Sequence, residues 1–429
     1  MSSTDRKHIV IIGGGFGGLW AARALGDTDV NVTLIDKKNH HTFQPLLYQV
    51  ATAVLSPGEI AQPIRKIQHW AENIEVILGE VVDVDRTSGE VVLRDGSRIP
   101  FGYLIVAAGA RHSYFGHGEW EADAPGLKTI EDAVDIRRRI LLAFENAERD
   151  AYLSGVDRPL HFVIIGGGPT GVELAGAIAD IARKALAKDF RAIDTRRARV
   201  TLFEGSDKIL SSFGKDLSES AKSQLESLGV SVRLHSFVTE VEKRRIKVAD
   251  EWIDSDVVLW ATGVAASPLG KTLGVETDKA GRVFVEPDLS IPGDPNIFVI
   301  GDMASLMQDG ESVPGVSPAA MQMGEATAEN ILRDLGGQPR QTFRYVDRGT
   351  MATIGRRRAI ADIKGWKFRG LIAWLMWLFL HVFFLIGFRN RFAVLFEWFW
   401  AYLTRERSAR LITGDADELS VGPRQTPNG

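Results

Sequence analysis

The stretch HFVIIGGGPTGVELAGAIA, residues 161–179, decides the fold that this sequence predicts. A run of β-branched and aromatic residues ends in Gly166-x-Gly168-x-x-Gly171, and a helical pattern follows directly. In a strand, turn and helix of this kind, the glycines allow tight turning, close approach of a pyrophosphate and packing of helix on strand. The free N–H groups of the helix then face the anion. One such motif by itself is weak evidence.

The same sequence pattern occurs near the N-terminus as HIVIIGGGFGGLWAARAL, residues 8–25. Its glycines are Gly13, Gly15 and Gly18. Two such units in one chain can hold two dinucleotides that face each other. That arrangement is typical of a flavoprotein that oxidises a nicotinamide.

A second pair of matching segments supports a duplication. The strand YLIVAAGA ends in the small residues Ala107, Ala108 and Gly109, which let the backbone approach a cofactor closely. Its counterpart VVLWATGV contains Gly263. The offsets from Gly13 to Gly166 and from Gly109 to Gly263 are 153 and 154 residues. Such a constant offset indicates that the sequence contains the same unit twice.

An acidic residue closes the second strand of each unit. Asp36 follows the strand 30–35, 23 positions after Gly13, where a carboxylate accepts hydrogen bonds from ribose hydroxyls. A solvated loop aspartate is the alternative. Glu204 closes VTLFE 38 residues after Gly166, which is longer than the usual spacing of about 20. The extra residues, rich in Arg and Lys around RAIDTRRAR, predict a longer helix and loop. Because an acid here repels a 2′-phosphate, Glu204 predicts a preference for NADH over NADPH.

A third strand end carries another candidate. In PNIFVIGDMASL the strand 297–300 ends in Gly301-Asp302, and a helical pattern runs from about 318 to 335. Asp302 is placed to accept a hydrogen bond from a ribityl hydroxyl. A helix N-cap is the alternative.

The bulk composition of the 429 residues excludes several classes of function. The hydrophobic fraction of 45% and the net charge of −4 indicate a globular protein with no general attraction for nucleic acid. Cysteine is absent, which excludes disulfides, thiolate metal sites and reactive thiols. The nine histidines lack paired ligand spacing, so no metal site is expected. The N-terminus shows no apolar signal region, and we expect the protein to stay on the cytoplasmic side.

These motifs together resemble the two-dinucleotide-domain flavoproteins, and among them the bacterial type II NADH dehydrogenases, which are single-subunit NADH:quinone oxidoreductases. FQPLLYQVATAVLSP at 43–57, GGGPTGVELAGAI at 166–178 and the ATG and GD motifs at 261–263 and 301–302 carry the resemblance. It implies that the first glycine unit, Asp36 and Asp302 bind FAD. The second unit then binds NADH, and residues 43–47, which include Gln44, lie near the isoalloxazine ring.

The resemblance also implies two catalytic candidates. Glu173 matches a glutamate that the family keeps close to the contact of nicotinamide and flavin, although an acid near a helix N-terminus also simply stabilises the helix. The family's quinone motif is Ala-Gln-x-Ala-x-Gln, and the aligned stretch here is SPAAMQ, residues 317–322. Gln322 is therefore the quinone-side candidate, with an ordinary polar helix residue as the alternative. Pro318 replaces the first glutamine of the motif.

The C-terminal region differs in composition from the rest of the chain. Residues 344–410 carry 13 Lys and Arg against four Asp and Glu. The run 371–388 has 18 residues without formal charge; as a helix it is about 27 Å long, against a hydrocarbon core of about 30 Å. His381 inside the run, and basic residues on both sides of it, oppose a transmembrane span.

The following stretch, 391–407, has apolar residues at helical spacing, namely Phe392, Leu395, Phe396, Phe399 and Leu403. Arg391 precedes them, and Arg405 and Arg407 follow them. Such a face suits a helix lying in the interface of an anionic membrane. An apolar stripe is also typical of a core or of a homodimer surface. We expect residues 366–407 to bind the cytoplasmic face of the cell inner membrane as a peripheral attachment.

The sequence thus predicts an α/β fold with two Rossmann-like dinucleotide-binding domains and a C-terminal membrane-associating helical segment. The expected domains are the first part of the FAD domain (1–120), a linker and crossover helix (121–155), the NADH domain (156–270), the second part of the FAD domain (271–345) and the C-terminal region (346–429).

The predicted function is transfer of a hydride from NADH to FAD and then of two electrons to a membrane quinone, without proton pumping. Two alternatives stay open at this point. A reductase of a ferredoxin-type protein would not need the apolar C-terminal region. A non-catalytic nucleotide-sensing scaffold would keep both glycine motifs.

Overall fold

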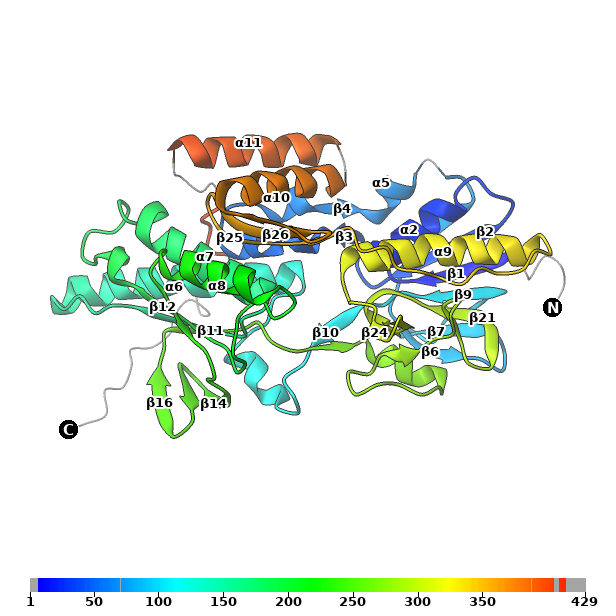
Figure 1. Ribbon diagram of the computed structural model, residues 1–429, viewed down its shortest axis with the longest axis horizontal. Coiled ribbons are helices and arrows are strands. Elements are labelled where there is room, and N and C mark those ends of the chain that lie inside the picture. Colours follow the sequence, from blue (N-terminus) through cyan, green and yellow to red (C-terminus); the bar gives the residue numbers. More distant parts are fainter. Residues whose placement is uncertain (1–6, 70, 387, 405–408, 414–429) are drawn as a thin grey trace. The chain divides into compact units, whose positions relative to one another are not determined.

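The computed structural model describes residues 7–69, 71–386, 388–404 and 409–413 (Figure 1). By its contacts the chain divides into two compact units. The first comprises Met1–Thr42, Ala61–Ser113 and Val264–Arg348. The second comprises Phe43–Ile60, Tyr114–Gly263 and Gly349–Gly429. The segment 43–60 therefore packs with the second unit, whereas the sequence-based boundaries place it within residues 1–120.

A six-stranded sheet forms the core of the first unit, in the order β20-β21-β9-β1-β2-β5. All neighbouring strands are parallel except the edge pair β20 and β21. The strands are β1 (His8–Ile12), β2 (Asn31–Asp36), β5 (Ile74–Leu78), β9 (Tyr103–Val106), β20 (Ser290–Ile291) and β21 (Asp294–Val299). The apolar residues 9–12 are at most 5% exposed, because a central parallel strand is covered on both faces. This burial explains the uninterrupted apolar run of the sequence.

Two helices lie side by side on this sheet, α2 (Phe16–Leu25) in blue and α9 (Ser317–Leu335) in yellow (Figure 1). They approach so closely that a Cβ at Gly324 would lie 2.3 Å from the carbonyl oxygen of Gly17. The helices predicted after the first glycine turn and over 318–335 are confirmed.

The smaller elements of the first unit are short strands and turns. They are an antiparallel sheet of β6 (Val81–Asp85), β7 (Glu90–Leu93) and β8 (Arg98–Pro100), the pairs β10 (Ala110–His112) with β18 (Val264–Ala266), β19 (Val283–Phe284) with β22 (Ala304–Ser305) and β23 (Met307–Gln308) with β24 (Glu311–Ser312), and the 3-10 helices η5 (Pro268–Leu273) and η6 (Gly301–Met303).

The second unit repeats the pattern around a four-stranded parallel sheet in the order β13-β12-β11-β17. Its elements are β11 (His161–Ile165), β12 (Arg199–Phe203), β13 (Val230–Arg233) and β17 (Val257–Trp260), the antiparallel sheet β14 (Val238–Glu242), β15 (Arg245–Val248) and β16 (Glu251–Asp254), the helices α6 (Ile130–Ser154), α7 (Pro169–Asp180) and α8 (Lys215–Glu226), and the 3-10 helices η2 (Gly118–Ala122) and η4 (Thr195–Arg197). In both units the pattern of strand, glycine turn, helix and strand is followed by a three-stranded antiparallel sheet, as a duplication predicts.

The sequence explains where the helices of this unit begin and end. A capping box starts α6, since the amide of Asp132 donates to Thr129 Oγ1 at 3.1 Å and the amide of Thr129 donates to Asp132 Oδ2 at 2.8 Å. Gly155 ends that helix in a left-handed conformation with φ of 71°. Beyond α7 the chain continues as a π-helical turn, η3 (Ile181–Ala185). The extended helix expected before Glu204 is therefore present.

The C-terminal region begins with strands that the sequence analysis did not predict. An antiparallel meander of β25 (Thr350–Gly355), β26 (Arg358–Ile363) and β27 (Trp366–Arg369) precedes α10 (Gly370–Phe384) and α11 (Phe388–Thr404). Helix α10 covers β26 through a buried cluster of small residues, Ala359, Ala361 and Ala373. Figure 1 shows α10 and α11 side by side in orange and red.

None of the helices in the described part of the chain combines the length and the apolar character that a membrane span requires. The apolar run 371–388 is divided between the two helices, because α10 ends at Phe384. Arg405 and Arg407, and the side chains of Arg389 and Leu403, lie outside the described residues.

The segment between β2 and β5, expected as a loop with a short helix, contains six short elements. They are β3 (His40–Thr42), η1 (Gln44–Leu46), α3 (Leu47–Ala51), α4 (Pro57–Ile60), β4 (Ala61–Pro63) and α5 (Ile64–Gln68). The buried face of α3, with Leu47 and Val50 at most 2% exposed, belongs to the core of the second unit.

Candidate nucleotide and electron-transfer sites

The backbone around Gly13, Gly15 and Gly18, here called the first cradle, has a conformation that only glycine permits at positions 13 and 18. Gly13 has a φ of 104°, and a Cβ on it would lie 2.4 Å from the carbonyl oxygen of Ala107. A Cβ on Gly18 would lie 1.8 Å from the carbonyl oxygen of Gly13. Nothing lies within 4 Å of a Cβ on Gly15, the N-cap of α2, so the space in front of the helix N-terminus is open. These residues fit the pyrophosphate of a dinucleotide.

Asp36 is fixed at the edge of this cradle. Its Oδ2 accepts a hydrogen bond of 2.5 Å from the amide of Gly14, and its Oδ1 accepts one of 2.7 Å from the amide of Lys38. A carboxylate held by two backbone N–H groups keeps its remaining lone pairs for a ribose diol. The solvated loop aspartate is therefore the weaker interpretation.

The second glycine turn repeats the first in detail. Gly166 has a φ of 109°, and a Cβ on it would lie 2.7 Å from the carbonyl oxygen of Ala261. A Cβ on Gly171 would lie 1.9 Å from the carbonyl oxygen of Gly166, whereas the space around Gly168, the N-cap of α7, is open to 4 Å.

Glu204 occupies in this cradle the place that Asp36 has in the first. Its Oε2 accepts a hydrogen bond of 2.6 Å from the amide of Gly167, and its Oε1 accepts from the amide and hydroxyl of Ser206 at 2.8 and 2.7 Å. The parallel pairing of β12 with β11 brings Glu204 to the glycine turn despite the long spacing in the sequence.

The small residues after β9 and β17 lie at the cradles. Gly109 and Gly263 both have a positive φ, of 68° and 75°. Ala108 lies 3.3 Å from the Cβ position of Gly13, so that the end of β9 packs directly on the first turn. The strand after Gly109, β10, pairs with the strand after Gly263, β18, in antiparallel register.

His41 is a residue at the first cradle that the sequence analysis did not single out. It is 3% exposed, its Nδ1 donates to the carbonyl oxygen of Gly14 at 3.0 Å, and its ring meets Phe16 edge-on at 4.9 Å. Burial lowers the pKa of His41 to about 4, so the ring is neutral at pH 7. Its buried Nε2 has no partner within the part of the chain that the structure describes. An unpaired acceptor at the cradle fits a ligand that donates a hydrogen bond there.

The remaining candidates of the first unit lie on η6 and α9. Asp302 lies on η6, and the N-cap of α9 is Val316, with no side-chain hydrogen bond. The side chain of Gln322 is bound at both ends, since its Nε2 donates to the carbonyl oxygen of Val346 at 3.1 Å and its Oε1 accepts from the amide of Val346 at 2.9 Å. Among the described residues, the second N–H of this amide has no hydrogen-bond acceptor. Gln44, in the second unit, is the exposed first residue of η1.

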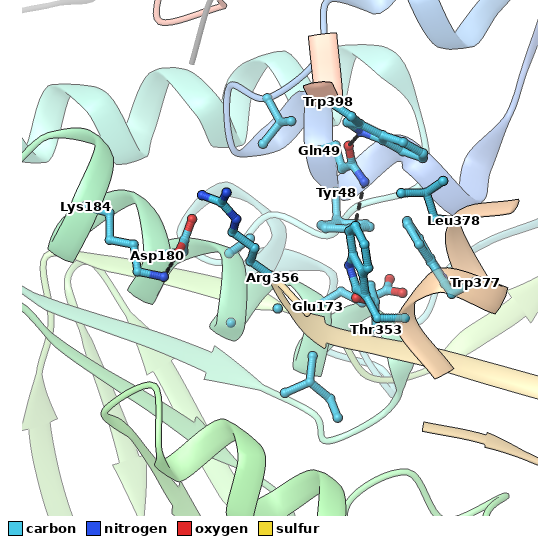
Figure 2. A pocket seen from close by; sticks show the side chains of 16 residues that line it. Tyr48, Gln49, Glu173, Asp180, Lys184, Thr353, Arg356, Trp377, Leu378 and Trp398 are labelled. Atoms are coloured by element: carbon cyan, nitrogen blue, oxygen red, sulfur yellow. Dashed lines mark hydrogen bonds and ion pairs between the residues drawn. The ribbon is translucent and has the colours of Figure 1, made fainter. Parts of the chain in front are cut away.

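The second unit contains a cavity of about 130 Å³ with Glu173 in its wall (Figure 2). Aromatic side chains form one end of the cavity, and Asp180, Lys184 and Arg356 form the other. Burial raises the pKa of the Glu173 carboxyl well above its ordinary value, although a hydrogen bond from the amide of Thr353 acts in the opposite direction. Glu173 therefore carries a proton under conditions in which an exposed glutamate is ionised.

A buried chain of hydrogen bonds closes the aromatic end. The indole Nε1 of Trp398 donates to Gln49 Oε1 at 2.7 Å, and Gln49 Nε2 donates to the hydroxyl of Tyr48 at 2.9 Å (Figure 2). Trp377 packs against Trp398 with ring centroids 5.8 Å apart. The sequence gives no signal for these contacts, because they join α3 to α11, more than 300 residues away, and α11 to α10.

Among the residues that the structure describes, no three His, Cys, Asp or Glu side chains are grouped so that they could hold a metal ion.

Comparison with known proteins gives the class to which this fold and these cradles belong. Residues 7–324 match the family model described as pyridine nucleotide-disulphide oxidoreductase, and residues 348–406 match the NDH2 C-terminal domain. The chain belongs to the pyridine nucleotide-disulphide oxidoreductase family.

Relatives define its place within that family. The chain is 44% identical over 423 residues to the type II NADH:quinone oxidoreductase Ndh of Mycobacterium tuberculosis, covering 95% of this chain and 90% of the relative. It is also 44% identical over 426 residues to NdhA of the same organism, with the same coverage. It is accordingly a type II NADH:quinone oxidoreductase by family.

Solved structures agree in fold. NDH2 from Plasmodium falciparum in complex with NADH superposes with a TM-score of 0.84 at 19% identity, covering 95% of this chain and all of that one. The sulfide:quinone oxidoreductase of Aquifex aeolicus gives a TM-score of 0.72 at 19% identity, covering 90% of this chain and 92% of that one. The resemblance stated from the motifs is confirmed, and so is the predicted α/β fold with a separate C-terminal domain.

The protein transfers electrons from NADH through FAD to a quinone without pumping protons, and its cofactors are FAD and NADH. The disulphide chemistry of the family's name is excluded here, because the chain has no cysteine. FAD supplies the redox chemistry when bound, and the protein binds and orients the two nucleotides.

Proposed function

We propose that the cradle of the first unit holds FAD and that the cradle of the second unit holds NADH. One observation supports a nucleotide site in both cradles, and the order of FAD and NADH follows from the resemblance of the sequence motifs. In each cradle a carboxylate at the end of a strand accepts a hydrogen bond from a backbone amide of the glycine turn. Asp36 accepts it from Gly14, and Glu204 accepts it from Gly167. That carboxylate then faces the ribose of a nucleotide whose pyrophosphate lies at the helix N-terminus. The backbone beside Ala108, Gly109 and Gly263, and Asp302 and Gln44, contribute to the same two sites.

The two open glycines allow the assignment to be tested one cradle at a time. Gly15 and Gly168 have φ of −75° and −70° and open space at Cβ, so valine is tolerated by the fold but collides with a bound phosphate. We expect Gly15→Val to yield a folded, colourless protein. We expect Gly168→Val to retain flavin and to raise the KM for NADH at least about tenfold, because hydrogen bonds to charged phosphate contribute about 1.5–3 kcal/mol each.

The measurements are the flavin absorption spectrum, its bleaching by NADH without oxygen, and its recovery with a soluble quinone. If Gly168→Val lost flavin while Gly15→Val kept it, the assignment would be reversed. A wild-type protein that binds flavin but is not bleached by NADH would support the nucleotide-sensing scaffold instead.

Glu173 is proposed as the acid at the redox site. The raised pKa of its carboxyl and its position in the second turn of α7, next to the NADH cradle, support this role. Glu173→Gln keeps the shape but cannot exchange the proton. We expect turnover to fall far more than thermal stability, and wild-type kinetics in this variant would contradict the role.

Gln322 is proposed to position the quinone through the second N–H of its amide. Removing it in Gln322→Ala also removes the two bonds to Val346, so both the KM for quinone and the stability should change. A KM for quinone equal to wild type would assign Gln322 a purely structural function.

We also propose that α10 and α11 attach the protein to the cytoplasmic face of the inner membrane. The two helices expose large apolar side chains, with Phe379 72% and Phe396 53% exposed. Further exposed residues on them are Leu371, Ile372, Leu375, Phe383, Phe392, Leu395, Phe399 and Trp400. His381 does not weaken this surface, since burial lowers its pKa to about 4 and leaves the ring neutral. Attachment at this surface brings the protein to the lipid in which its quinone dissolves.

The attachment is tested by flotation with vesicles of anionic lipid. Phe379→Glu combined with Phe396→Glu should abolish flotation and leave flavin bleaching by NADH unchanged. Leu153→Glu, at an apolar residue of α6 that is 75% exposed, is the matched control and should still float. A homodimer through the same surface is the competing prediction, and sedimentation of the double variant as a monomer from a dimeric wild type would support it.

A further inference from the structure

The cavity of the second unit runs along one face of α7 and its π-helical continuation. Glu173, Ala177, Asp180 and Lys184 all line it, at positions i, i+4, i+7 and i+11 of the helical segment. At about 1.5 Å per residue, Asp180 lies about 10 Å and Lys184 about 16 Å along the axis from Glu173. The face therefore leads from the carboxyl of Glu173 to the charged side chains of Asp180 and Lys184.

The two ends of this face differ in the side chains that line them. Asp180 Oδ1 pairs with Lys184 Nζ at 2.6 Å, and their side chains are 21% and 42% exposed. Arg356 lies on the same side of the cavity (Figure 2). Glu173 lies beside Thr353 on the aromatic side (Figure 2). The only charged groups in the cavity lining, as the structure describes it, are Glu173 itself and these three at the outer end.

The middle of the passage is narrow and lined by small residues. A Cβ on Gly176 would lie 1.8 Å from the carbonyl oxygen of Ile354, so α7 and β25 touch through their backbones there. Ala177, one turn after Glu173, contributes only a methyl group. A volume of about 130 Å³ is below the usual range of about 300–1,000 Å³ for small-molecule pockets, but it has room for several waters with polar partners at both ends.

The reaction requires a supply of protons from water. In NADH + H⁺ + quinone → NAD⁺ + quinol, the hydride of NADH provides one hydrogen and both electrons. The second hydrogen of the quinol arrives as a proton from water. A redox site that excludes water needs a route for this proton.

We propose that the cavity along α7 is the path by which this proton reaches Glu173, and that Asp180 collects it from water at the outer end. The inference rests on the proposed place of Glu173 at the redox site. Asp180 acts through Glu173 and touches neither nucleotide nor quinone. Lys184 holds the Asp180 carboxylate in place by their ion pair.

The first experiment separates the two half-reactions by stopped flow. Hydride transfer from NADH consumes no proton from water, so Asp180→Asn should bleach the flavin at the wild-type rate. Reoxidation by quinone should slow roughly tenfold at alkaline pH, where protons are scarce. Formate should restore the rate by carrying protons to the passage. Glu226→Gln, which removes a carboxylate from the comparable pair with Lys222 on α8, is the control and should behave as wild type.

The second experiment follows the proton directly and needs no turnover. The infrared carbonyl band of the protonated Glu173 is assigned by its loss in Glu173→Gln, and its shift is timed after mixing with D₂O. Ala177→Leu places a larger side chain between Glu173 and the outer end. Exchange should slow in both Asp180→Asn and Ala177→Leu, and formate should rescue only Asp180→Asn.

The outcomes distinguish this inference from the proposed function. Unchanged exchange and unchanged quinone reoxidation in both variants would overturn the proton path while leaving the NADH:quinone activity intact. Slowed exchange in both variants, with normal flavin bleaching, supports the path. If Glu173→Gln had wild-type turnover, the role of Glu173 would fail, whatever the exchange rates.

Discussion

Glu204 gives the most direct test of how the second cradle chooses its nucleotide. Three hydrogen bonds of 2.6 to 2.8 Å from Gly167 and Ser206 hold the carboxylate at the end of β12. Because it cannot move away, a nucleotide carrying a 2′-phosphate must bring that phosphate close to a fixed negative charge. We therefore expect the wild-type protein to prefer NADH.

The size of the preference follows from Coulomb's law. At about 5 Å and an effective dielectric constant of about 40, each unit charge on the phosphate costs about 1.7 kcal/mol. With about 1.5 to 2 charges, and screening at a half-buried side chain, the net penalty is about 2 to 3 kcal/mol. This corresponds to about 30- to 160-fold in kcat/KM.

The assay is steady-state oxidation of NADH and NADPH with a soluble quinone. Glu204→Gln removes the charge and keeps a group that hydrogen-bonds the ribose, so the ratio of the two kcat/KM values should fall at least about tenfold, mainly through better use of NADPH. Glu240→Gln, which removes a carboxylate paired with Lys247 elsewhere in the same unit, should leave the ratio unchanged. A wild-type protein that uses NADPH as well as NADH, or a ratio untouched in Glu204→Gln, would refute the reasoning.

Three further predictions concern packing and protonation. Gly171→Ala should destabilise the fold by about 1–3 kcal/mol and weaken NADH binding, because its Cβ meets the carbonyl oxygen of Gly166; thermal unfolding and NADH titration measure the two effects. Gln49→Ala should cost about 1–3 kcal/mol by leaving the buried indole N–H of Trp398 unpaired, and an unchanged melting temperature would contradict this. Because the pKa of Glu173 is raised in the folded chain, its contribution to stability is complete below the pKa of the unfolded chain and is lost as pH rises through the folded value. The melting temperature of the wild type should therefore fall relative to Glu173→Gln between weakly acidic and alkaline pH, and parallel profiles would be the contrary result.

Much of the first cradle was predictable, because its parts are local in sequence. The strand, the glycine turn and α2 are continuous over residues 8–25, and their side-chain requirements are strict. Asp36 was also predictable, since it ends the next strand of a parallel sheet. His41 was not, because two adjacent histidines in a short strand carry no sign that one ring turns inward to Gly14.

The C-terminal region shows the opposite case. Its apolar run indicated helices at a membrane surface, and α10 and α11 are present, but the meander β25–β27 before them was missed. Those strands are short and alternate weakly, and they are ordered by packing on α7 through Gly176 and Ile354. Propensity within the segment does not contain that contact.

The sequence by itself determined that two nucleotides are bound, because tight turns, open helix N-termini and strand-end acids depend on residue types at fixed spacing. Tertiary structure alone decided which carboxyl is shielded and what lines the cavity beside it. The wall around Glu173 is assembled from α3, α7, β25, α10 and α11, and burial raises the pKa of an acid only where such distant segments exclude water together. Local sequence fixes what each side chain is, whereas the long-range packing of the chain fixes the dielectric surroundings in which it acts.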